Sequence, residues 1–224
     1  MSSLHTRQHG VGWLNEVGAR MRTFWPAKLF GTLLGMTAFF AVYFWLLRHP
    51  RYPLTVVPLT AVDRLIGFQS RAVFLYLSLW LYVSLAPALL IDRLELVSYG
   101  LAAAALSGIG FVVFLFWPTA VMRPDVGWPQ SSAFAFLESV DASGNACPSM
   151  HVAFAVFTAV WFERLLRQMG AGRLVWVLNW LWCLGILYST VAIRQHVVLD
   201  VLAGAVLGAA VAAVPMRLLR THER

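Results

Sequence analysis

Charged side chains are scarce in this sequence. Only 12% of its 224 residues are charged, whereas 60% are hydrophobic and the mean hydropathy is +0.72. A soluble chain of this length could not bury so much apolar surface in one core, but a bilayer accommodates it because lipid-facing side chains need no protein cover. The composition therefore predicts an all-α, polytopic membrane protein.

The sequence also has only two cysteines, no cluster of carboxylates and no evident N-terminal leader. The two cysteines, Cys147 and Cys183, show no metal-binding spacing and are not expected to pair. We therefore expect no metal and no other cofactor. The first long apolar run starts only near Leu29, after a polar stretch, so we expect no cleavable signal peptide.

The formal net charge of +7 could suggest a nucleic-acid partner, but the basic residues do not gather on one soluble face. They are spread over short loops and chain ends, as expected for the flanks of membrane helices. We predict no nucleic-acid partner, and the oligomeric state stays open.

The apolar runs predict a bundle of six membrane-spanning helices within residues 29–216. Each run is about as long as the 17–25 residues that a bilayer core requires. Residues 1–28 are expected to form an interfacial amphipathic helix and residues 217–224 a basic tail. The long loop 118–147 lacks a clear element and is expected to be functional. The predicted spans are 29–47, 72–91, 97–117, 149–165, 174–193 and 197–214.

The distribution of lysine and arginine predicts the orientation. With a cytoplasmic N-terminus, the inner segments hold 11 of the 17 basic residues and the outer segments hold 6. We therefore expect both termini on the cytoplasmic side of a bacterial-type inner membrane. This topology brings Arg123, His151 and His196 to one face, on the periplasmic side.

His196 and Asp200 are four residues apart and would share one face of a helix. The carboxylate can then accept a hydrogen bond from one imidazole nitrogen, which leaves the other nitrogen as a nucleophile. A purely structural His–Asp pair at a helix junction explains this spacing equally well.

Pro148-Ser149-Met150-His151 has the composition of a helix start. The free N–H groups at such an end bind anions, so the Ser149 hydroxyl and the Met150 amide could hold phosphate oxygens while His151 protonates a leaving oxygen. Arg123 and Arg194 could contribute bidentate cations. Taken one at a time, an ordinary helix start and solvated arginines remain the simpler interpretations.

The three segments together resemble the type 2 phosphatidic acid phosphatase superfamily. The matching residues are Arg123-Pro124, then Pro148, Ser149 and His151, then Ser189, His196 and Asp200. The resemblance implies a metal-independent membrane phosphatase that acts on a lipid phosphomonoester or diphosphate. It also implies that His196 forms a phosphohistidine, that Asp200 orients His196, and that His151 serves as acid and then as base. The implied partners are the lipid phosphate substrate and membrane lipids.

Three positions depart from the pattern of that superfamily. Phe116 stands in place of a lysine, Met150 in place of a glycine and Thr190 in place of an arginine, so that Arg194 is a candidate replacement cation beside Thr190. The run 189–204 is more similar to the branch of inositol phosphorylceramide and sphingomyelin synthases. Two alternatives therefore stand: a lipid head-group transferase with the same residues, and a non-catalytic lipid-binding protein.

Overall fold

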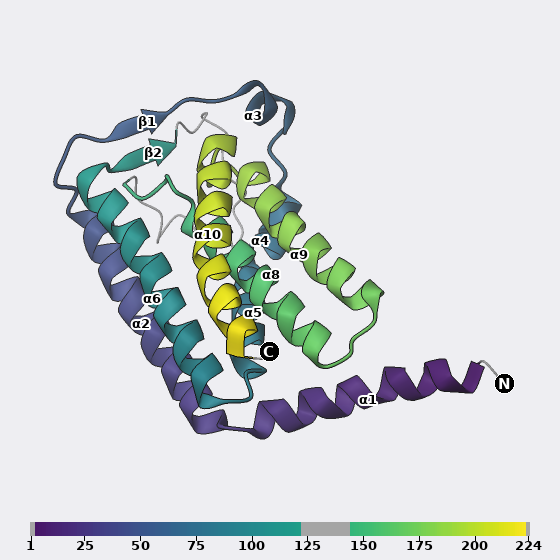
Figure 1. Ribbon diagram of the computed structural model, residues 1–224. Coiled ribbons are helices and arrows are strands. Elements are labelled where there is room, and N and C mark those ends of the chain that lie inside the picture. The colour runs from purple at the N-terminus through teal and green to yellow at the C-terminus, as the bar shows by residue number, and fades with distance from the viewer. Residues whose placement is uncertain (1–2, 122–143, 223–224) are drawn as a thin grey trace.

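The computed structural model describes residues 3–121 and 144–222 of the chain, which are mostly helical (Figure 1). The residues between α2 and α6 form several short elements, and the remaining helices are long. In chain order the elements are α1 (Ser3–Arg22), α2 (Trp25–Arg48), β1 (Thr55–Val57), α3 (Ala61–Leu65), η1 (Ser70–Ala72), α4 (Val73–Leu77), α5 (Leu79–Ala88), α6 (Arg93–Phe116), β2 (Thr119–Val121), α8 (Met150–Gln168), α9 (Arg173–Ala192) and α10 (Val198–His222).

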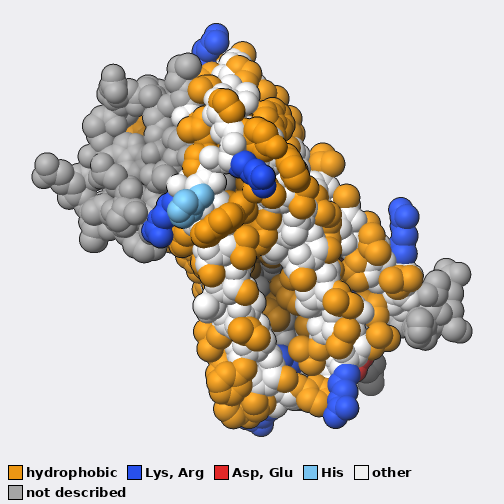
Figure 2. All heavy atoms as spheres, turned by 90° about the vertical axis from the view of Figure 1, so that its left-hand side faces the viewer, with side chains coloured by type: hydrophobic (Ala, Val, Ile, Leu, Met, Phe, Trp, Pro, Cys, Tyr) orange, Lys and Arg blue, Asp and Glu red, His pale blue; other side chains and the backbone are white. Residues whose placement is uncertain are grey.

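Five helical segments in the described part of the chain are long and apolar enough to cross a bilayer. Together they confirm an all-α membrane protein. Figure 2 shows hydrophobic side chains over most of one face of the molecule, with lysines and arginines mainly towards its two ends. The five segments are Trp25–Arg48, Ser70–Ala88, Arg93–Phe116, Arg173–Ala192 and Val198–Leu219.

The predicted span 149–165 corresponds to α8, which is a helix but is not among those five. Its last turns carry Glu163, Arg164 and Arg167, and these charges lower its hydropathy. The count of six spans therefore stays a prediction. Helix α8 is central to the packing, because Val152, Ala155, Phe157, Ala159 and Trp161 are all fully buried along it.

Helices α8 and α10 approach each other very closely. A Cβ atom on Gly204 would lie 2.4 Å from the Ser149 carbonyl oxygen, and one on Gly208 would lie 2.2 Å from the Ala153 carbonyl oxygen. The two glycines are four residues apart, so they lie on the same face of α10 and admit the backbone of α8. This contact sets the distance between the N-termini of the two helices.

At the opposite end of the bundle, α1 and the start of α2 are attached through polar contacts. The Lys28 Nζ atom donates to the carbonyl oxygens of Arg20 at 2.6 Å and Ala88 at 3.0 Å. Trp13 and Val17 of α1 pack against the main core, while the interfacial amphipathic helix expected over residues 1–28 stays a prediction. Helix α10 runs to His222, so no helix end marks the expected boundary at residue 217.

Short strands lie at the other end of the bundle, which the sequence did not predict. Strand β1 pairs in parallel with β2, with Thr55 opposite Thr119 and Val57 opposite Val121. Figure 1 shows both strands and α3 at the end of the molecule where α10 begins, away from α1 and the C-terminus. The strands therefore lie on the side of the bundle that carries the predicted catalytic residues.

Candidate active site

The start of α8 is built as the sequence predicts. Ser149 is its N-cap residue, and the Ser149 Oγ atom accepts a hydrogen bond from the Val152 amide at 3.3 Å. The Ser149 amide itself donates to the Asp200 carbonyl oxygen at 3.1 Å, which ties this helix start to α10. The amides of Met150 and His151 have no recorded acceptor among the described residues, and they point out of the first turn as such amides do.

The segment before α8 is held by Thr119 of β2. The Thr119 amide donates to the Gly144 carbonyl oxygen, and its carbonyl oxygen accepts from the Ala146 amide. Its hydroxyl oxygen accepts from the Cys147 amide at 2.7 Å. Because these bonds fix residues 144–147, the strand pair determines where the chain enters the first turn of α8.

A tight turn delivers His196 to the start of α10. The Thr190 carbonyl oxygen accepts from the amides of both Gln195, at 3.0 Å, and His196, at 3.1 Å. Arg194 adopts the left-handed region within this turn, with φ of 63°. Asp200 lies in the first turn of α10, where its Oδ2 atom accepts from the Val197 amide at 3.1 Å.

The two predicted catalytic histidines meet across this junction. The ring centroids of His151 and His196 are 5.7 Å apart, and the His196 Nδ1 atom lies 3.5 Å from Asp200 Oδ2. His196 is 6% exposed and Asp200 is fully buried. The Nδ1 atom of His196 therefore faces the carboxylate at slightly more than hydrogen-bonding distance, and its Nε2 atom lies on the other side of the ring.

Two residues that the sequence did not single out complete the arrangement. The Tyr76 hydroxyl is 2.6 Å from His151 Nε2, and the two rings lie 4.7 Å apart between centroids. Asp63, in α3, is fully buried, and its Oδ1 atom accepts from the Val198 amide at 2.8 Å. The only sequence signal for Asp63 is its capping-box spacing after Thr60, which predicts a helix start rather than a site.

The remaining predicted site residues differ in what surrounds them. Arg194 donates from Nη1 to the Asp63 carbonyl oxygen at 2.8 Å, and its buried Nε atom has no hydrogen-bonding partner in the described part of the chain. The Thr190 hydroxyl is directed away, donating to the Leu187 carbonyl oxygen at 2.8 Å. The Met150 side chain packs with its sulfur over Gly110. Arg123 lies outside the described residues.

The Asp200 carboxylate also affects a neighbouring thiol. Burial, together with the negative charge of Asp200 and a hydrogen bond to it, raises the pKa of Cys147 to about 11. Cys147 is therefore protonated at neutral pH and a poor nucleophile or metal ligand there. Neither cysteine of the chain forms a disulfide.

The family model of the PAP2 superfamily matches residues 95–224, which is more than half of the chain. The chain belongs to the PAP2 superfamily. Membership supports an activity of the phosphatase or phosphotransferase type on phosphoesters. No curated protein and no solved structure gives a match. The matched region of this PAP2 protein contains both histidines and Asp200, whereas Asp63 and Tyr76 precede it.

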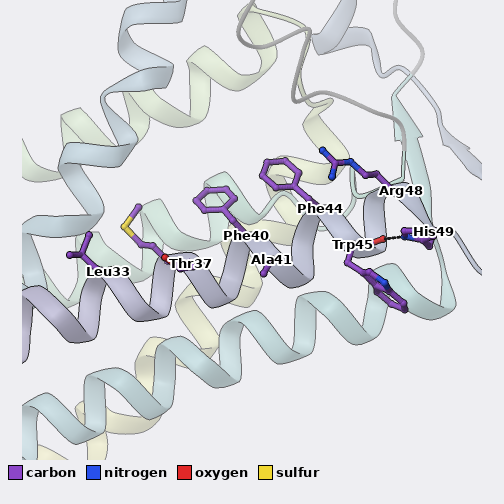
Figure 3. A pocket seen from close by; sticks show the side chains of 9 residues that line it. Leu33, Thr37, Phe40, Ala41, Phe44, Trp45, Arg48 and His49 are labelled. Carbon is purple, nitrogen blue, oxygen red and sulfur yellow. Dashed lines mark hydrogen bonds between the residues drawn. The ribbon is translucent and has the colours of Figure 1, made fainter.

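A groove of about 700 Å³ runs along the exposed side of α2. Figure 3 shows Phe40, Phe44 and Arg48 projecting from the same side of this helix, with His49 beside Arg48 at its end. The groove is apolar apart from Thr37, Arg48 and His49. The Phe40 ring lies 5.2 Å from the Trp80 ring, which in turn lies 6.0 Å from the His151 ring, so aromatic contacts connect the groove with the site.

Proposed function

We propose that this PAP2 protein is an integral-membrane lipid phosphatase that hydrolyses a phosphomonoester or diphosphate through a phosphohistidine. The observation that supports the proposal best is the approach of His151 to His196, 5.7 Å between ring centroids, with Asp200 on the Nδ1 side of His196. A nucleophilic imidazole held by a carboxylate, with a second imidazole within reach of the same phosphate, suits in-line phosphoryl transfer.

In the first step, His196 Nε2 attacks phosphorus. The nitrogen–phosphorus bond forms while the bond from phosphorus to the lipid oxygen breaks, and His151 gives a proton to that oxygen. Asp200 stabilises the positive charge that develops on the His196 ring. In the second step, His151 takes a proton from water, which attacks phosphorus and releases phosphate from His196.

The charge on the phosphate oxygens needs donors in both steps. The amides of Met150 and His151 at the start of α8, which have no acceptor within the described part of the chain, and the Ser149 hydroxyl are suited to this role. We assign Arg194 and Arg123 as the cations of the site. The phosphate contact of Thr190 also stays part of the proposal, although its hydroxyl already donates to Leu187. No step uses a metal ion or another cofactor.

The lipid is proposed to reach the site from within the bilayer. Its hydrocarbon chain would lie in the groove along α2, and Arg48 at the end of the groove would attract the phosphate. This proposal includes α8 as a sixth span, an interfacial α1, cytoplasmic termini in a bacterial-type inner membrane, and a site on the periplasmic face.

The missing family cations favour a second candidate, a head-group transferase of the sphingolipid or phospholipid synthase type. Phe116 is 60% exposed at the end of α6, and Thr190 supplies no charge. A site with fewer cations suits a phosphodiester, which carries one negative charge. In that case a lipid hydroxyl would replace water as the acceptor.

Phosphate release from a panel of lipid monophosphates and diphosphates tests the proposal, with EDTA present throughout. The detergent-purified protein should release phosphate, and His196→Ala and His151→Ala should not. Gly108→Ala provides the control because a Cβ atom there meets no atom within 4 Å. Head-group exchange between added lipids without phosphate release would favour the transferase. A non-catalytic lipid-binding protein would show neither reaction.

A further inference from the structure

We infer that Tyr76 is the positioning residue of His151: it binds His151 Nε2 and leaves Nδ1 to exchange protons with the substrate. The inference rests on the proposed function, because it concerns the acid and base of that reaction. Tyr76 lies in α4, before the region that the PAP2 superfamily match covers. It therefore lies outside the region that shows the family.

The contact between the two residues is specific and shielded. The Tyr76 hydroxyl oxygen is 2.6 Å from His151 Nε2, and the rings are tilted by 30° at a centroid distance of 4.7 Å. Tyr76 is 4% exposed and packs in one cluster with Val73 and with Ile193, the residue that follows α9. Its ring is thus held between the start of α4 and the turn that carries His196.

Each of the two histidines turns one ring nitrogen towards a neighbour. His151 Nε2 makes a hydrogen bond of 2.6 Å with the Tyr76 hydroxyl, whereas His196 Nδ1 faces Asp200 Oδ2 at 3.5 Å, slightly beyond hydrogen-bonding distance. A ring nitrogen that is held by a neighbour fixes the tautomer and directs the other nitrogen outward. His196 then attacks with Nε2, and His151 handles protons with Nδ1.

A phenol suits this position because its oxygen accepts a hydrogen bond without carrying charge. When His151 is an imidazolium, Nε2–H donates to Tyr76 and Nδ1–H donates to the lipid oxygen as its bond to phosphorus breaks. After that transfer, Nε2–H still donates to Tyr76 and Nδ1 has a free lone pair. The same lone pair accepts the proton of the attacking water, so Tyr76 gains and loses no proton over the cycle.

The leaving group provides a test that a merely structural role would not pass. An alkoxide is a poor leaving group and needs a proton from His151, whereas an aryl oxide such as p-nitrophenolate leaves with little help. Tyr76→Phe keeps the ring and removes only the hydroxyl. It should lower kcat on a lipid monophosphate by about 10- to 100-fold, lower it much less on p-nitrophenyl phosphate, and change KM little.

Tyr82→Phe is the matched control. Tyr82 belongs to the next helix, is fully buried, and donates its own hydrogen bond of 2.6 Å to Asn179 Oδ1. Tyr82→Phe therefore removes a buried hydroxyl that bonds Asn179 and leaves the hydrogen bond of His151 in place. Equal losses on both substrates, or a Tyr76→Phe enzyme that behaves as Tyr82→Phe does, would overturn the inference.

A second readout needs no turnover. Nitrogen-15 spectra of histidine-labelled protein, with the His151 signals identified by their loss in His151→Ala, report which ring nitrogen carries the proton. We expect neutral His151 to hold its proton on Nε2 in the wild type and in Tyr82→Phe, and to become a tautomer mixture in Tyr76→Phe. An unchanged spectrum in Tyr76→Phe would overturn the inference. A wild type inactive on every phosphate would overturn the proposed function, and the spectrum would still decide whether Tyr76 holds His151.

Discussion

Gly204→Ala should lower kcat by about 100-fold without unfolding the protein. The new Cβ atom would lie 2.4 Å from the carbonyl oxygen of Ser149 and 3.2 Å from the Val152 Cβ atom. The first of these neighbours is backbone within a helix cap, so it cannot rotate away as a flexible side chain would. The helices α8 and α10 must separate at this point.

The size of the separation follows from the contact distance. Ordinary van der Waals contact begins at 3.4 Å, whereas the new Cβ atom would lie 2.4 Å from the Ser149 oxygen, so α8 must move by about 1 Å. Such overpacking lowers the free energy of unfolding by about 1–3 kcal/mol. The better helix propensity of alanine offsets up to about 1 kcal/mol of this loss. The net loss of stability is therefore small. However, His151 is two residues from Ser149, and a displacement of about 1 Å between catalytic groups lowers the rate by about 100-fold.

Phosphate release and thermal unfolding, measured on the same detergent-purified samples, separate the two effects. Gly108→Ala is the control, since a Cβ atom there meets nothing within 4 Å. We expect Gly108→Ala to match the wild type in kcat, and Gly204→Ala to lose about 100-fold in kcat with a shift of only a few degrees in Tm. A Gly204→Ala enzyme within twofold of the control would refute the link between helix spacing and the site.

Three further changes probe the surroundings of the site. Asp63→Ala should lower the free energy of unfolding by about 2 kcal/mol and remove most of the activity, because the Val198 amide loses its buried acceptor. Asp63→Asn keeps one oxygen, so it should lose less stability and less activity. The pKa of Cys147 is raised from 9 to about 11, so maleimide should label it about 100-fold more slowly than an ordinary thiol at pH 7.5. The labelling rate, measured in a Cys183→Ser background, should rise towards pH 11. Gly110→Ala should lower the stability of the wild type, because the new Cβ atom would meet the Met150 sulfur, but it should not lower the stability of a Met150→Ala protein. Additive losses of stability in the double variant would contradict this contact.

The local features of the site could be predicted because they depend on neighbours in sequence. The cap at Ser149 involves residues three positions apart, where helix geometry decides the contact. His196 and Asp200 do lie close together, but not on one helix face as the spacing predicts: His196 precedes α10, and the tight turn after α9 brings its Nδ1 atom to 3.5 Å from Asp200. The apolar runs also predicted most of the long helices to within about four residues at each end, but α10 continues to His222, and the predicted span 72–91 is divided into η1, α4 and α5. The interfacial position of α1 and the sixth span are statements about a membrane, and they stay predictions.

The contacts that could not be predicted join residues far apart in the chain. Tyr76 meets His151 across 75 positions, and Asp63 meets Val198 across 135. A tyrosine in an apolar run fits lipid interfaces and helix packing equally well, so its residue type gives no signal. The strand pair was missed for a related reason: three-residue strands are too short for a period to be detected.

The two helix N-termini at the site have different partners, and this bears on the missing family cations. Two carboxylates occupy the start of α10, since Asp63 accepts from Val198 and Asp200 accepts from Val197. The positive end of that helix therefore stabilises the acids that hold the His196 segment and is not available to a phosphate. Among the described residues, the start of α8 has only the uncharged cap of Ser149, and the amides of Met150 and His151 have no acceptor there. In the proposed mechanism the phosphate oxygens therefore belong at α8, and a Met150 side chain directed at Gly110 leaves its own amide accessible to them.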